Sequence, residues 1–99
     1  MQRQGKSRPA PVTPEQAFAK ALREVRTEKG ISQEGLALDA NYHRTYVSLL
    51  ERGKMNPSLR TILSIAAVLE IPAADLIQRV ETHLGGPWKR QPVDHLKRK

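Results

Sequence analysis

The sequence predicts an all-α domain built from five short helices. Apolar residues recur at intervals of three and four in five segments, which is the spacing that places side chains on one face of a helix. Residues typical of helix ends separate these segments, and no segment shows the alternation typical of a strand. The links are short, so we expect a compact five-helix body over residues 13–84, preceded by an arm (1–12) and followed by a tail (85–99).

The first helix has a well-defined start and stop. Thr13 and Gln16 have the spacing of a capping box, and Pro14 suits the first turn, where its missing N–H costs nothing. Gly30 is expected to end the helix in a left-handed conformation. The apolar face between these ends comprises Phe18, Ala21, Leu22 and Val25.

Two helices of about eight residues follow, separated by a very short turn. The second begins after Ser32 and ends before Asn41, one of the few non-glycine residues that tolerates a positive φ. The third runs from about Arg44 to Glu51 and stops at Gly53. We expect the buried residues to be Leu36, Ala37 and Ala40 in the second helix, and Val47 and Leu50 in the third.

The last two helices carry the clearest apolar patterns. Asn56-Pro57-Ser58 forms a loop that ends in a cap, and Pro72 separates the two helices. Gly85-Gly86-Pro87 is expected to end the folded part, leaving a basic, disordered tail. The expected buried stripes are Leu59, Ile62, Ile65, Ala66 and Leu69 in the fourth helix, and Leu76, Ile77, Val80 and Leu84 in the fifth.

The positive charge of the chain is unevenly distributed. The net charge is +7, and it resides in the arm and the tail, because residues 13–84 carry equal numbers of acidic and basic side chains. Within that neutral part, residues 40–60 carry several basic side chains against a single acid, Glu51. A neutral domain with one basic segment indicates a nucleic-acid partner more strongly than a basic pI does.

Several classes of function are not expected. The chain has no cysteine, and its three histidines are scattered, so neither a disulfide framework nor a metal site is predicted. No apolar run is long enough for a membrane span, and the N-terminal residues lack a signal-peptide pattern, so we expect a cytoplasmic protein. No catalytic constellation is present, so we expect neither an enzyme nor a cofactor.

Residues 32–53 carry the functional prediction. Two short helices joined by so short a turn cannot run antiparallel, so they cross steeply as a helix-turn-helix. The second of them then projects from the body, and its width suits the major groove of DNA. Val47 and Leu50 account for only one side of it, which leaves small and long polar side chains on the other.

The same segment resembles the lambda-repressor-like (Xre or Cro type) helix-turn-helix family. The resemblance covers residues 17–77, and residues 44–52 are especially similar to controller proteins of restriction–modification systems. The motifs that carry it are Ser32-Gln33-Glu34, Leu36-Ala37, Tyr46-Val47-Ser48, Leu50-Glu51-Arg52-Gly53, Asn56-Pro57-Ser58-Leu59 and Ile65-Ala66 with Leu69.

The resemblance implies two sets of DNA contacts and one internal bridge. Arg26 and Glu51 match an ion pair that joins the first helix to the third, and Gln33 matches a residue that also braces the third helix. The residues implied to read bases are Arg44, Thr45, Tyr46 and Ser48. The residues assigned to phosphates are Gln33, His43, Lys54 and Asn56.

Three positions depart from the family pattern. Asn41 replaces the usual turn glycine, and His43 replaces the Ser or Thr that caps the third helix, so we expect a weaker cap there. Glu70 stands where a helix-ending glycine is common. None of these changes is expected to alter the fold.

The predicted assembly is a homodimer on a palindromic double-stranded operator. Val80 and Leu84 extend the last apolar stripe past what a small domain can cover, which favours a dimer interface over a frayed helix end. The alternative function is the antitoxin of a toxin–antitoxin pair, which binds its own promoter and uses the C-terminal tail to bind a toxin. The sequence therefore predicts a DNA-binding transcriptional regulator of controller or repressor type.

Overall fold

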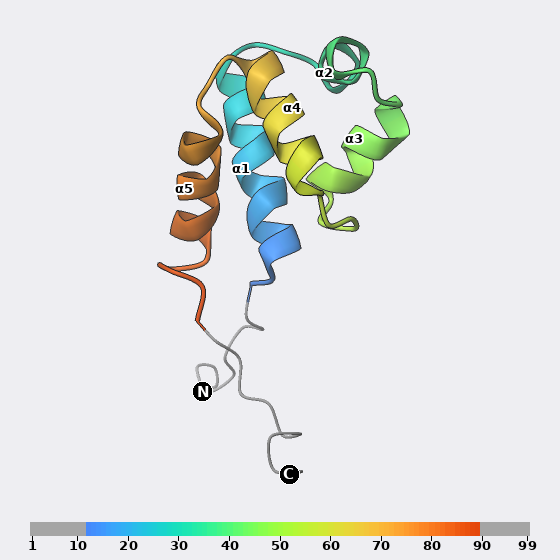
Figure 1. Ribbon diagram of the computed structural model, residues 1–99. Coiled ribbons are helices and arrows are strands. Elements are labelled where there is room, and N and C mark those ends of the chain that lie inside the picture. Colours follow the sequence, from blue (N-terminus) through green and yellow to red (C-terminus); the bar gives the residue numbers. More distant parts are fainter. Residues whose placement is uncertain (1–11, 90–99) are drawn as a thin grey trace, which may run out of the picture.

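The computed structural model describes residues 12–89, which form five α-helices and no strand within that range. The helices are α1 (Pro14–Glu28), α2 (Gln33–Ala40), α3 (Arg44–Glu51), α4 (Leu59–Leu69) and α5 (Ala73–His83). Figure 1 shows α1 at the centre of the body, with α5 along one side and α3 and α4 toward the other. The predicted all-α, five-helix architecture is confirmed.

The helix starts form as their sequences predict. In α1, Thr13 Oγ1 accepts the backbone N–H of Gln16 (3.1 Å), and Gln16 Oε1 accepts that of Thr13 (3.0 Å), which completes the capping box. The hydroxyls of Ser32 and Ser58 cap α2 and α4 in the same way. His43 gives α3 no side-chain cap, as expected for this residue.

Two helices end in left-handed residues that are not glycine. Asn41 closes α2 with φ 62°, so the prediction of a positive φ is confirmed. Glu70 closes α4 with φ 58°, and the N–H of Ile71 reaches back to the carbonyl of Ala66 (3.1 Å). This hydrogen bond satisfies a helix-end carbonyl that would otherwise lack a partner. Glu70 therefore closes α4 in a conformation typical of glycine, and the exit of the helix is intact.

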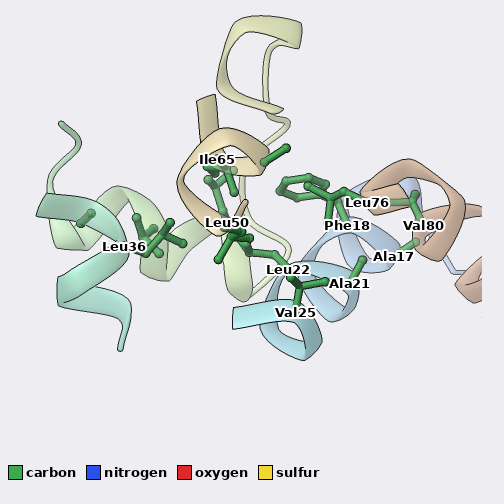
Figure 2. Packing of buried hydrophobic residues seen from close by; sticks show 14 residues of the cluster. Ala17, Phe18, Ala21, Leu22, Val25, Leu36, Leu50, Ile65, Leu76 and Val80 are labelled. Atoms are coloured by element: carbon green, nitrogen blue, oxygen red, sulfur yellow. The ribbon is translucent and has the colours of Figure 1, made fainter. Parts of the chain in front are cut away.

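The apolar core lies where α1 meets the other helices. α1 packs against α3 and α5, and α4 packs against α2 and α5. Figure 2 shows the side chains converging between these helices. The largest side chains of the core are Phe18, Leu22, Leu36, Leu50, Ile65, Leu69 and Leu76.

Burial differs from the prediction in the last two helices. Leu59 is 71 % exposed, because Thr61 takes the buried place in the first turn of α4. Ile77 is also exposed, whereas Val80 is buried and Leu84 partly buried. The premise that Val80 and Leu84 extend beyond what the domain can cover is therefore wrong: α5 packs along α1, and both residues join the core there.

No single helix within residues 12–89 is long and apolar enough to cross a membrane. α4 and α5 pass that test only as a pair, on length and composition, and they are bent by 110° at the break between them. Most of the predicted arm, and residues 90–99 of the predicted tail, lie outside the described residues.

Candidate nucleic-acid interface

The outer side of α3 presents unengaged polar side chains. Arg44 and Thr45 are exposed at the start of the helix, and Ser48 is partly exposed one turn later. None of these three side chains forms a hydrogen bond or ion pair with another residue of the 12–89 region. Val47 and Leu50 occupy the opposite side, fully buried. Three of the four predicted base-reading residues therefore share one accessible surface.

A buried carboxylate holds α3 in place. Glu51, the last residue of α3, is 1 % exposed, and its two oxygens accept hydrogen bonds from Arg26 Nε (2.5 Å) and Nη2 (2.8 Å). Gln33 Nε2 donates a third hydrogen bond to the same carboxylate (3.0 Å). The Arg26–Glu51 clamp, as we call these three side chains, thus joins α1, α2 and α3 at one point.

Electrostatic interactions favour the charged forms of both Glu51 and Arg26. Burial alone would raise the pKa of Glu51, but the hydrogen bonds from Arg26 and Gln33 and the nearby guanidinium charges outweigh it and lower that pKa. The hydrogen bond to Glu51 raises the pKa of Arg26 in turn. The clamp is therefore an ion pair at neutral pH.

Two further bonds from α1 extend the clamp. Arg26 Nη1 donates to the carbonyl of Ile31, in the link between α1 and α2 (2.8 Å). Arg23 Nη2 donates to the backbone carbonyl of Glu51 at the end of α3 (2.8 Å), where a cation is favoured by the helix dipole. Because α1 holds the link that precedes α2 as well as the end of α3, the pair α2–α3 is fixed as a unit on the body.

Tyr46 faces the body of the domain, apart from the other predicted base readers. Its hydroxyl lies 3.3 Å from Thr61 Oγ1, and its ring centroid lies 5.1 Å from that of Tyr42. Tyr42 donates to the same Thr61 hydroxyl (3.2 Å), and so does Ser58 (3.0 Å). A hydroxyl can accept two hydrogen bonds and donate one, so Thr61 satisfies all three neighbours.

Sequence reasoning missed the roles of Tyr42 and Thr61. Thr61 lies 19 residues from Tyr42 and 15 from Tyr46 along the chain, so no local sequence pattern indicates that their hydroxyls meet. The one signal that could have indicated them was Thr61 itself, a polar residue next to the apolar stripe of α4.

The predicted phosphate-binding residues lie at three places. Gln33 begins α2, but its amide is used by the clamp. His43 is exposed immediately before α3. In the loop after α3, Lys54 is exposed, and Asn56 Nδ2 donates to Glu15 Oε2 on α1 (2.8 Å). The side chains of Gln33 and Asn56 thus have internal partners, whereas those of His43 and Lys54 are accessible.

That loop is positioned by a close approach to α1. Gly53 has φ 70°, and a Cβ there would lie 3.3 Å from Cγ of Gln16. Only glycine adopts this conformation readily and leaves space for α1.

No three His, Cys, Asp or Glu side chains within the described part of the chain are grouped so that they could hold a metal ion.

Comparison with known proteins identifies the family. A family model described as helix-turn-helix matches residues 22–76, more than half of the chain, and this range includes the whole α2–α3 unit. The chain belongs to the helix-turn-helix family. The resemblance predicted from the sequence is confirmed.

The relatives of this helix-turn-helix chain are regulators and controller proteins. It is 43 % identical over 60 residues to the HTH-type transcriptional regulator DdrOP3 of Deinococcus deserti, a match that covers 61 % of the chain and 46 % of that protein. The chain thus spans about half the length of this relative. It is 45 % identical to the restriction–modification controller protein C.AhdI of Aeromonas hydrophila, with a TM-score of 0.61. That match covers 63 % of this chain and 94 % of C.AhdI.

A third match was solved with DNA. The restriction–modification controller protein C.Esp1396I, described as a tetramer in complex with its natural 35 base-pair operator, is 27 % identical with a TM-score of 0.66. The match covers 72 % of this chain and 93 % of that one. The helix-turn-helix fold of this chain is therefore one that a solved relative places on operator DNA.

Proposed function

We propose that this chain is a sequence-specific transcriptional regulator that binds double-stranded DNA with α3 in the major groove. The observation that carries the proposal is the contrast within α3: Arg44, Thr45 and Ser48 are accessible and have no partner within residues 12–89, while the Arg26–Glu51 clamp fixes the helix that bears them. Side chains that read base edges need this combination of free polar groups and a rigid support.

The surrounding residues supply contacts to the DNA backbone. His43 and Lys54 lie on either side of α3 along the chain and are free to approach phosphates. Gln33 acts mainly by bracing Glu51, and the N-terminus of α2 offers backbone N–H groups in its place. Asn56 reaches a phosphate only if it leaves Glu15.

We further propose that the chain acts as a homodimer of the controller type, placed with the chromosomal DNA in the cytoplasm. One short helix contacts too few base pairs for selectivity in a genome, and pairing doubles the contacts. Because Val80 is buried and Leu84 partly buried, we propose an interface at Leu59 and Leu63, which are 71 % and 51 % exposed and lie one turn apart on α4. This is the largest pair of exposed apolar side chains on one helix face within residues 12–89.

Selection of bound fragments from random DNA tests this function. The expected outcome is an enriched motif with two inverted halves about one helical turn apart, ~34–36 Å. A variant with Arg44, Thr45 and Ser48 all changed to Ala should fold normally and enrich no motif. Failure of the unchanged protein to enrich any sequence would refute the proposed function.

A further inference from the structure

A second basic surface adjoins the reading side of α3. Three cationic side chains, Lys20 and Arg23 from α1 and Arg52 from the end of α3, surround a hollow between these two helices. All three are exposed. The hollow is completed by Val12, Gln16, Ala19 and Glu51.

Arg52 connects this hollow with the reading side. It follows Ser48 by four residues and Arg44 by eight, so the three lie about one turn apart on the same side of α3. The accessible basic surface therefore continues from the reading residues, past Arg52, onto α1.

The two acids in the second half of α1 are paired with side chains of α5. Lys20 and Arg23 line the hollow, and Glu24 and Glu28 do not. On α5, Arg79 donates to Glu28 Oε2 (2.8 Å) and Oε1 (2.7 Å) and to Glu24 (3.4 Å). Glu24 Oε2 also lies 2.9 Å from His83 Nε2. Glu24 and Glu28 are thus engaged by partners on α5, although they also line a second hollow with Lys20 and Arg23.

The acid within the hollow is also neutralised. Glu51 forms the floor and is paired with Arg26 in the clamp. Arg23 has a structural role as well, since it caps α3 through the Glu51 carbonyl. Lys20 and Arg52, however, make no side-chain hydrogen bond or ion pair anywhere in the 12–89 region. The hollow therefore presents uncompensated positive charge.

We propose that this hollow, with Lys20 as its principal contact, binds the phosphate backbone of DNA that flanks the operator. The inference rests on the proposed function, because the hollow continues the surface that would carry α3 into the groove. An isolated basic patch could equally suit an acidic protein. Because the hollow is continuous with the outer side of α3, a single elongated polyanion could contact both surfaces. A DNA duplex that extends beyond the operator is such a polyanion.

Duplexes of two lengths test the proposal, both built around the operator recovered by selection. One ends at the operator and the other adds about ten base pairs on each side. The variant is Lys20→Gln, and the matched control is Lys29→Gln, an exposed lysine at the end of the same helix that does not line the hollow. Binding is measured at several salt concentrations.

The unchanged protein should bind the longer duplex more tightly. In Lys20→Gln that advantage should shrink several-fold, and the slope of log affinity against log salt should fall by about 0.9 for each phosphate that the protein no longer neutralises. Lys29→Gln should retain both. Equal binding of Lys20→Gln and the unchanged protein to the longer duplex would overturn the inference, and so would an equal loss on both duplexes. Tight binding to the short duplex would in either case leave the proposed function standing.

Discussion

Individual charged residues of this domain divide into those that hold the structure and those that face outward. Glu51 and Arg26 are largely buried and satisfy each other with two hydrogen bonds. Arg44, exposed on the same helix as Glu51, has no such partner in the described region. Charge alone does not distinguish the two roles, because Arg26 is structural and Arg44 faces outward. Burial and hydrogen bonding distinguish them.

Replacing Arg44 with Ala should reduce discrimination more than general affinity. An arginine that contacts a guanine contributes about 1–3 kcal/mol to the choice of that base pair, whereas contacts to phosphates are the same for every sequence. The measurement is the ratio of affinities for the selected operator and for random DNA. Lys29→Ala, an exposed lysine at the end of α1, serves as control. An equal loss on both DNAs would assign Arg44 to a phosphate instead.

Replacing Glu51 with Gln should destabilise the fold by about 3–5 kcal/mol, because Arg26 would remain buried without an opposite charge. The measurement is urea unfolding at pH 7. Glu34→Gln, an exposed residue on α2, is the matched control and should change little.

The lowered pKa of Glu51 also predicts that the free energy of unfolding depends on pH. The pKa of Glu51 is lowered in the folded state, so the unfolded chain takes up its proton first as the pH falls. The stabilisation is complete above the ordinary value of 4.5 and is lost as the pH falls from there through the folded pKa. In Glu51→Gln, the free energy of unfolding should vary less with pH below 4.5. An unchanged acid dependence would show that Glu51 contributes no such linkage.

At the scale of elements, α4 supports the turn between α2 and α3 through one hydroxyl. Thr61 is buried in the first turn of α4 and contacts Tyr42 in the turn and Tyr46 in α3. α1 holds the other end of α3 through Glu51. α3 is thus fixed near both ends by two different helices.

Replacing Thr61 with Val keeps the shape of the side chain and removes its hydroxyl. Tyr42, Tyr46 and Ser58 would lose their common partner, and we expect a loss of about 1–3 kcal/mol of unfolding free energy. Urea unfolding measures it, with Thr27→Val on the exposed side of α1 as control. If the two variants were equally stable, the shared hydroxyl would have no role in holding α3.

Local signals in the sequence were enough to predict the elements. The capping box of Thr13 and Gln16 and the left-handed Asn41 depend on residues within one turn, so their outcome could be predicted without the rest of the chain. The exposure of Leu59 and the burial of Val80 depend on which neighbour covers each helix face, and the sequence does not state that neighbour. The inward position of Tyr46 was missed for the same reason, since Thr61 lies on another helix.

At the scale of the whole molecule, residues 12–89 present three surfaces with different chemistry. The outer side of α3 is polar, the adjoining edge of α1 is basic, and the exposed side of α4 is apolar at Leu59 and Leu63. A regulator that pairs on DNA needs one surface for bases, one for phosphates and one for its second copy. Under the proposed function, each of these three surfaces would serve one of these contacts.

Replacing Leu63 with Ser should weaken pairing. Each dimer would lose two apolar side chains from its interface, and burial of each leucine contributes about 1.5–3 kcal/mol, so the dissociation constant should rise at least tenfold. Sedimentation equilibrium measures the constant. Leu38→Ser, an 80 % exposed leucine on α2, is the control. Unchanged association of Leu63→Ser would place the interface elsewhere.

Arg44, Thr45 and Ser48 have no internal partners within the described residues, and this affects how the recognised DNA sequence can evolve. A duplicated copy of the gene could exchange these three side chains and acquire a new target site, while its stability remained that of the parent. The scaffold and the recognised sequence could then diverge independently, so that proteins with nearly the same body would control unrelated promoters.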